Sequence, residues 1–205
     1  GEIESGQLTC KKCHTAYPII RGIPRILKGL AGEGAKIAND FGYEWQHYRE
    51  MHNEYRQQFL DWIVPLNADS FRNRVVLDAG CGMGRHIYWA AKFGAKDVIG
   101  IDASTSVDVA KATTQGLENV HLVQANIYTL PFGKPFDMVY SIGVLHHLPE
   151  PENGFRTLLG HLRQGGQVFA WVYGKEGSML LSPLLLVRKV TSHMPRWLVN
   201  QLAFL

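Results

Sequence analysis

The sequence is poor in cysteine and has no long apolar run. Its three cysteines are an odd number, which argues against a disulfide framework and predicts a reducing, cytoplasmic compartment. The longest apolar run, residues 179–187, is about half a membrane span and contains Pro183. We therefore predict no transmembrane helix, and the first twenty residues show no secretory signal.

Charge of one sign is not concentrated in any block either. Lys and Arg number 21 against 18 Asp and Glu, a net charge of +3, and no run of five or six like charges occurs. Proteins dedicated to nucleic acids usually gather basic residues on one face, so this balance argues against a nucleic-acid partner. The 205 residues, 46% of them apolar, suffice for one full core with a small appendage.

Apolar, strand-like segments alternate with helical ones through the middle of the chain. The expected strands are residues 74–78, 96–102, 120–124, 136–141 and 166–172. Buried strands separated by helices predict a parallel sheet covered on both faces, an α/β Rossmann-like, doubly wound fold. Ligands bind such sheets beyond the carboxyl ends of the strands, so we expect the chemistry in the loops that follow them.

Four segments follow from this pattern. We predict a small β appendage in residues 1–30, a linker with lid-like helices in 31–70, a cofactor-binding domain in 71–175 and a helical cap or interface in 176–205. In the second segment aromatic residues recur at helical spacing. Such residues, for example Trp45, fit either core packing or a lid over the cofactor.

A glycine-rich loop joins the first strand to its helix, Asp78-Ala-Gly80-Cys-Gly82-Met-Gly84. Its glycines let the backbone turn sharply and approach a ligand, and the helix start offers free N–H groups to an anion. The dinucleotide pattern requires glycine where Arg85 stands, so the loop favours a different cofactor. Asp78 is placed to pair with the ammonium of a bound amino acid, such as a methionine moiety.

Asp102 closes the second expected strand. A carboxylate there can accept hydrogen bonds from both hydroxyls of a ribose, a geometry that a neutral side chain reproduces poorly. The alternative is a helix N-terminal acid, a role that Ser104 or Ser106 would serve as well. The glycine loop upstream favours the ribose interpretation.

Five motifs in order resemble those of class I S-adenosylmethionine-dependent methyltransferases, most closely the group that includes the ubiquinone/menaquinone-biosynthesis enzymes. They occupy residues 76–85, 99–102, 124–131, 136–149 and 162–166. The resemblance implies S-adenosylmethionine as cofactor and a methyltransferase activity. It also implies that the final strands of this fold type are missing after the fifth expected strand.

The resemblance assigns cofactor-binding roles to residues at or just after the strand ends. These residues are Asp78, Gly80, Cys81, Gly82, Gly84, Asp102, Ala103, Asn126, Ile127, Ser141 and Ile142. The glycines would line the methionine and ribose, Ala103 would pack on the adenine, and Asn126 and Ile127 would contact the adenine amino edge. The family more often has Asp where Asn126 stands, but a carboxamide can also accept from the amino group.

Methyl transfer is an in-line displacement for which the protein mainly supplies alignment and a dry pocket. A hydroxyl or acidic-carbon acceptor benefits from a base, and His146 or His147 sits where one could act. The alternative, expected for at least one of them, is that the pair packs or caps its loop. We predict methylation of a small-molecule or lipid-like acceptor; the alternatives are a non-catalytic cofactor-binding module that works through a partner and an RNA methyltransferase.

Cys10 and Cys13 have the spacing of half a four-ligand zinc site. The surrounding residues 8–27 resemble the second half of small zinc-ribbon domains similar to the activator subunit of tRNA methyltransferases. In those domains an earlier cysteine pair completes the site. We predict a truncated zinc ribbon that binds zinc only in a longer form of the chain; two ordinary reduced thiols are an equally good interpretation.

Overall fold

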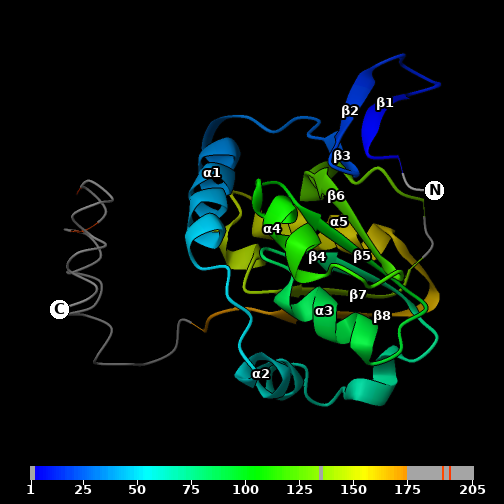
Figure 1. The fold of residues 1–205 in the computed structure, drawn as a ribbon, viewed down its shortest axis with the longest axis vertical. Coiled ribbons are helices and arrows are strands. Elements are labelled where there is room, and N and C mark those ends of the chain that lie inside the picture. The colour runs from blue at the N-terminus through cyan, green and yellow to red at the C-terminus, as the bar shows by residue number, and fades with distance from the viewer. Residues whose placement is uncertain (1–2, 134–135, 175–190, 192–193, 195–205) are drawn as a thin grey trace. The chain divides into compact units, whose positions relative to one another are not determined.

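The computed structural model of the protein describes residues 3–133, 136–174, 191 and 194 (Figure 1). The chain divides into two compact units, Gly1–Val172 and Tyr173–Leu205. The helical cap or interface predicted for residues 176–205 lies outside the described residues, apart from Thr191 and Met194. Within the described part of the chain, no helix combines the length and the apolar character needed to cross a membrane.

An eight-stranded sheet forms the centre of the first unit, in the order β1-β2-β3-β6-β5-β4-β7-β8. The strands from β3 onward pair in parallel, whereas β1, β2 and β3 pair with one another antiparallel. The five strands expected from the sequence are β4 Val75–Ala79, β5 Asp97–Asp102, β6 Val120–Ala125, β7 Phe136–Ile142 and β8 Leu162–Trp171. The prediction of an α/β, doubly wound, mostly parallel sheet is confirmed.

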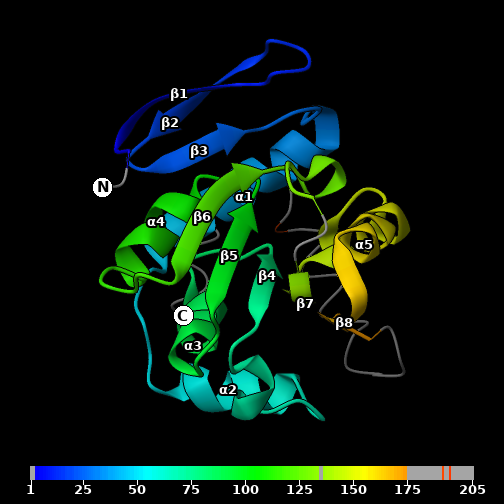
Figure 2. The same ribbon diagram turned by 90° about the vertical axis from the view of Figure 1, so that its right-hand side faces the viewer.

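Helices cover both faces of this sheet (Figure 2). They are α1 Gly32–His47, α2 Glu54–Trp62, α3 Arg85–Lys92, α4 Ser106–Thr113 and α5 Pro151–Gly160, with the 3-10 turns η1 Ala68–Phe71, η2 Ile127–Thr129 and η3 Leu145–His147. Successive strand residues face opposite sides. Val76 accordingly packs with α2, α3 and α4, whereas Leu77 packs in a second core with α5.

The N-terminal segment extends the same sheet. Strands β1 Ser5–Thr9, β2 Ala16–Ile20 and β3 Ile23–Ile26 form an antiparallel meander, and β3 pairs in parallel with β6. Ile23 is fully buried in the first core. The segment predicted as an appendage is therefore joined to the sheet through β3, whose Ile23 lies in the core, while β1 is exposed along its whole length.

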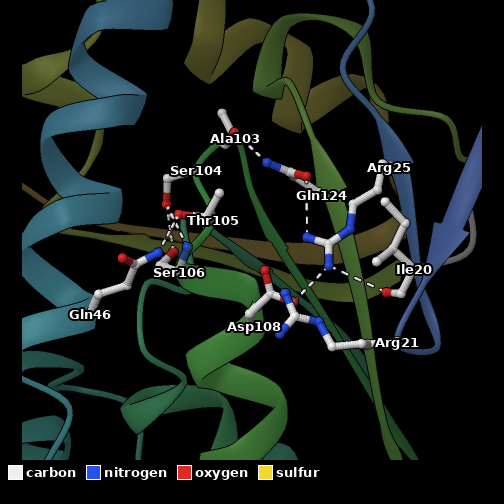
Figure 3. A network of polar contacts seen from close by, with 10 residues as sticks. All are labelled: Ile20, Arg21, Arg25, Gln46, Ala103, Ser104, Thr105, Ser106, Asp108 and Gln124. Carbon is white, nitrogen blue, oxygen red and sulfur yellow. Dashed lines mark hydrogen bonds and ion pairs between the residues drawn. The ribbon is translucent and has the colours of Figure 1, made fainter.

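The Arg25 side chain links β3 to α4 and β6 by hydrogen bonds (Figure 3). Its guanidinium donates to Asp108 Oδ1 of α4 at 2.6 Å and to Gln124 Oε1 of β6 at 3.2 Å. Gln124 Nε2 in turn donates to the carbonyl of Ala103 at 3.1 Å, directly after β5. Only 9% of the Arg25 side chain and 20% of the Asp108 side chain are exposed, so this ion pair is largely buried.

We expect the substitution Arg25→Met to destabilise the fold. Removing Arg25 leaves the largely buried Asp108 with only the exposed Arg21 as a partner, which costs up to about 3 kcal/mol. Chemical denaturation measures the free energy of unfolding. Arg21→Met is the matched control, since Arg21 also pairs with Asp108, at 3.2 Å, but its side chain is 72% exposed. The control should cost about 1 kcal/mol or less; equal losses in the two variants would show that Arg25 has no special structural role.

Candidate active site

The predicted cofactor residues meet at one edge of the sheet. Parallel strands end at the same edge, and the order β6-β5-β4-β7 sets the loops after these four strands side by side. The chain crosses from β6 over β5 and β4 to reach β7, which makes the edge beside β4 the switch point of the fold. Such a switch point is where open α/β sheets bind their ligands.

The glycine loop after β4 is held against the end of β5. The amides of Gly80 and Cys81 both donate to the carbonyl of Ile101, at 2.8 and 2.9 Å. Gly80 and Gly84 have φ angles of 93° and 90°, a left-handed conformation that favours glycine. A Cβ at Gly80 would lie 2.3 Å from Val144 Cγ2, so the loop admits no side chain there.

Asp102 is oriented by two backbone amides. Its Oδ2 accepts from the Gly82 amide at 3.0 Å and its Oδ1 from the Ser104 amide at 2.8 Å. A carboxylate offers about four lone-pair directions, so two remain for a ribose diol. The bond to Gly82 also joins the acid directly to the glycine loop.

The carboxyl group of Asp78 is almost completely shielded from solvent. It is 1% exposed, and Tyr140 Oη donates to its Oδ2 at 3.0 Å. Burial raises the pKa of Asp78 to about 8, and the nearby charge of Asp102 acts in the same direction. An ionised carboxylate here requires a cation, and the ammonium of a bound amino acid would meet that need.

Helix α1 covers this edge. The Trp45 indole lies against Gly82, where a Cβ would be 3.1 Å from Trp45 Nε1. The Phe41 ring meets the His147 ring edge-on, with centroids 5.0 Å apart, and Gln46 Nε2 donates to a hydroxyl of the loop after β5. One helix therefore contacts the loops after β4, β5 and β7; its role as a lid over the cofactor stays a prediction.

Arg85 is a residue of this edge that the sequence analysis did not assign to the site. Its guanidinium lies over the rings of Trp45, Tyr55 and Trp62, at 5.4, 5.1 and 5.6 Å from their centroids. These cation–π contacts join α1 and α2 to the first residue of α3. A cation directly after a glycine loop, downstream of regularly spaced aromatics, is the sequence signal that could have identified it.

The structure places the two histidines in η3, after β7. Both are half-buried, and their ring centroids are 4.1 Å apart. Ser141 and Ile142 end β7 and are buried, and Ser141 Oγ donates to the carbonyl of Ala79 at 2.8 Å. A catalytic role for His146 or His147 stays a prediction.

The side chain of Asn126 stabilises the loop after β6 by two hydrogen bonds. Asn126 Oδ1 accepts from the Tyr128 amide, and its Nδ2 donates to the carbonyl of Lys28, both at 3.1 Å. Asn126 and Ile127 are 4% and 7% exposed. Contacts of Asn126, Ile127 and Ala103 with an adenine stay predictions.

The three thiols have different surroundings. Cys81 is buried in the glycine loop, and burial raises its pKa. Cys10 and Cys13 lie in the β1–β2 turn, where hydrogen bonds from Thr15 and then Cys10 lower the pKa of Cys13 to about 7. In residues 3–133, 136–174, 191 and 194, no three His, Cys, Asp or Glu side chains are grouped to hold a metal ion.

A doubly wound sheet with a glycine loop after β4 and an acid at the end of the adjacent strand β5 matches the class I methyltransferase architecture. Comparison with known proteins agrees: residues 76–166 match the family described as a methyltransferase domain. The solved PH0226 protein from Pyrococcus horikoshii OT3 has a similar fold, with a TM-score of 0.52 and 24% identity over 62% of this chain and 65% of that chain.

Two curated relatives carry the name tRNA U34 carboxymethyltransferase. The protein from Pseudoalteromonas translucida (strain TAC 125) is 36% identical over 129 residues, which cover 60% of this chain and 39% of the relative. The protein from Shewanella pealeana (strain ATCC 700345 / ANG-SQ1) is 34% identical over 153 residues, which cover 67% of this chain and 45% of the relative. This chain spans less than half the length of these relatives.

Residues 76–166 therefore match a methyltransferase domain, in agreement with the predicted enzyme class and with S-adenosylmethionine as its cofactor. The names of the relatives contradict two other predictions, the small-molecule or lipid-like acceptor and the argument against a nucleic-acid partner. The cofactor motifs carry no information about the acceptor. The net charge averages over the whole chain and does not report where basic residues lie.

We expect Asp102→Ala to weaken binding of S-adenosylhomocysteine by about one to two orders of magnitude. The reason is that a hydrogen bond to a charged group contributes about 1.5–3 kcal/mol. Isothermal titration calorimetry measures the affinity. Asp97→Ala, at the opposite end of β5, removes an equal charge that bonds His121 and should leave the affinity unchanged. Equal affinities of the Asp102 variant and the wild type would remove Asp102 from the site.

The stability of the ligand-free protein should depend on the ionisation of Asp78. Its folded-state pKa of about 8 exceeds the ordinary value of 3.8, so the folded state binds the extra proton. The stability from this group is fully present below pH 3.8 and is lost as the pH rises to about 8. Relative to Asp78→Asn, the free energy of unfolding of the wild type should fall by about 1.4 kcal/mol per pH unit between about pH 5 and 7.

Chemical denaturation at several pH values measures this difference, and parallel pH profiles would contradict it. Tyr140→Phe is the matched control, because it removes the hydrogen bond to Asp78 and retains the carboxyl group. Its profile should keep the slope of the wild type.

Proposed function

We propose that this chain carries the cofactor-binding domain of an enzyme that alkylates a nucleobase of tRNA. The observation that carries the proposal is the 34–36% identity to proteins named tRNA U34 carboxymethyltransferase. That name specifies a carboxymethyl group. Transfer of a methyl group requires S-adenosylmethionine, whereas transfer of a carboxymethyl group requires a form of it that carries a carboxyl group on the transferred carbon.

The residues at the switch point suit such a donor. The glycine loop offers a surface without side chains, and Asp102 keeps lone pairs free for a ribose diol. The carboxyl group of Asp78 is desolvated and gains from an ammonium partner. These three features correspond to the methionine chain, the ribose and the amino group of the donor.

The donor supplies the reactive group, and the protein orients it, excludes water and accepts a proton. When bound, the donor supplies an electrophilic carbon on a sulfonium, and its bond to sulfur breaks with the electron pair left on sulfur as the nucleobase attacks. Asp78 and Asp102 orient the two ends of the site, and α1 with Trp45 excludes water from it. His146 or His147, in its neutral form, accepts the proton that the attacking nucleobase atom loses.

The β1–β2 turn enters the same proposal as the second half of a zinc ribbon. Cys10 and Cys13 supply two thiolates, and a tetrahedral structural site needs two more ligands. Among the described residues, no third His, Cys, Asp or Glu side chain is grouped with this pair. For an enzyme with a tRNA acceptor we propose the cytoplasm as its compartment.

The test is transfer to tRNA by the full chain. The protein is incubated with total tRNA and either S-adenosylmethionine or its carboxylated form, and the mass gained by digested nucleosides identifies the transferred group. We expect a modified nucleoside in the tRNA, formed at least tenfold more slowly by Asp102→Ala. A lipid extract and a small-metabolite pool serve as control acceptors. Transfer to a control pool with an unmodified tRNA fraction would refute the proposal.

A further inference from the structure

Basic residues are concentrated in the N-terminal strands. Residues 5–32 contain five Lys and Arg and no Asp or Glu. The other 16 basic residues share the remainder of the chain with all 18 acidic ones. The modest net charge of the whole chain conceals this separation, because a basic segment and a slightly acidic remainder nearly cancel.

The topology brings part of this segment to the edge that holds the candidate active site. Strand β3 runs parallel to β6, so its end at Ile26 lies at the carboxyl edge of the sheet. Strand β2 is antiparallel to β3, which puts the β1–β2 turn, residues 10–15, at that same edge. Figure 2 shows this turn and the arrowhead of β3 at the same end of the meander. Lys11, Lys12 and Lys28 thus flank the site.

The two arginines of the segment are engaged elsewhere. Arg21 and Arg25 both pair with Asp108, at 3.2 and 2.6 Å. Lys11, Lys12 and Lys28 are exposed, and none of them forms an ion pair with an acidic side chain of the described residues. Their positive charge is therefore available to a ligand.

Lys28 connects this charge to the site. Its ammonium lies near enough to Cys13 in the turn to help lower the pKa of that thiol. Its carbonyl accepts hydrogen bonds from Asn126 Nδ2 at 3.1 Å and from Thr129 Oγ1 at 2.9 Å. The same residue thus borders both the basic turn and the loop after β6.

We propose that Lys11, Lys12 and Lys28, here called the hairpin basic surface, bind the phosphate backbone of the RNA substrate. The inference rests on the proposed function. Lysine contacts to phosphates position a nucleic acid without reading its sequence, which suits a surface beside a site that acts on one base. Residues 9–15 contain no large apolar side chain to form the centre of an interface with a protein, and the exposed Leu8 and Leu27 beside them are single side chains on different strands or loops.

The double variant Lys11→Gln/Lys12→Gln tests the proposal in the full chain. Its matched control is Lys92→Gln/Lys96→Gln, which removes two exposed charges, one at the last residue of α3 and one directly before β5, at the opposite edge. Fluorescence anisotropy measures tRNA affinity at several salt concentrations, and calorimetry measures S-adenosylhomocysteine affinity as a check of folding.

We expect the hairpin variant to bind tRNA about tenfold more weakly and its salt-dependence slope to fall by about one to two. The control should stay within about twofold of the wild type, and both variants should keep the wild-type affinity for S-adenosylhomocysteine. Adding Lys28→Gln to the hairpin variant should weaken tRNA binding further, because it removes another phosphate contact.

Equal tRNA affinities in the hairpin and control variants would overturn the inference. If the wild type still modified tRNA, the proposed function would survive that result. If instead the wild type bound S-adenosylhomocysteine but neither bound nor modified tRNA, the proposed function itself would fail. If the hairpin variant lost binding to phosphatidylglycerol vesicles and kept the wild-type tRNA affinity, the inference would be overturned, and the ligand of this surface would be a membrane.

Discussion

The site depends on the attachment of the glycine loop to the end of β5. Two loop amides bond the Ile101 carbonyl and a third bonds Asp102, so loop and acid hold each other in place. This arrangement needs a backbone that can approach without side chains, which is why Gly80 cannot carry a Cβ beside Val144. The donor would therefore bind a glycine loop whose conformation is already set in the ligand-free protein.

Two carboxyl groups at this edge have different surroundings. Asp102 is half-buried and bonded by amides, whereas Asp78 is enclosed and held by Tyr140. Burial raises the pKa of Asp78 to about 8, so the ligand-free protein avoids a bare buried charge by keeping the proton. The cost of ionising this group is then linked to the arrival of an ammonium partner.

The N-terminal strands are coupled to the same edge by polar contacts. Arg25 bonds Gln124, which bonds the carbonyl of Ala103, and Lys28 bonds Asn126 through its own carbonyl. Both chains of contacts end in loops predicted to surround the adenine. A segment that resembles a separate metal-binding ribbon therefore helps to shape the active-site edge, and the hairpin basic surface is carried on it.

The sequence by itself determined the sheet, its cofactor loop and the acid at the end of β5, because alternating apolar segments and a glycine spacing are local signals. It did not reveal that Trp45 and Arg85 meet over the loop, since their contact joins helices far apart in the chain. Nor did it show that β3 pairs with β6, because a parallel pairing between distant segments leaves no local pattern. Only the tertiary structure decided which lysines flank the site, because strand direction sets the edge at which each turn emerges.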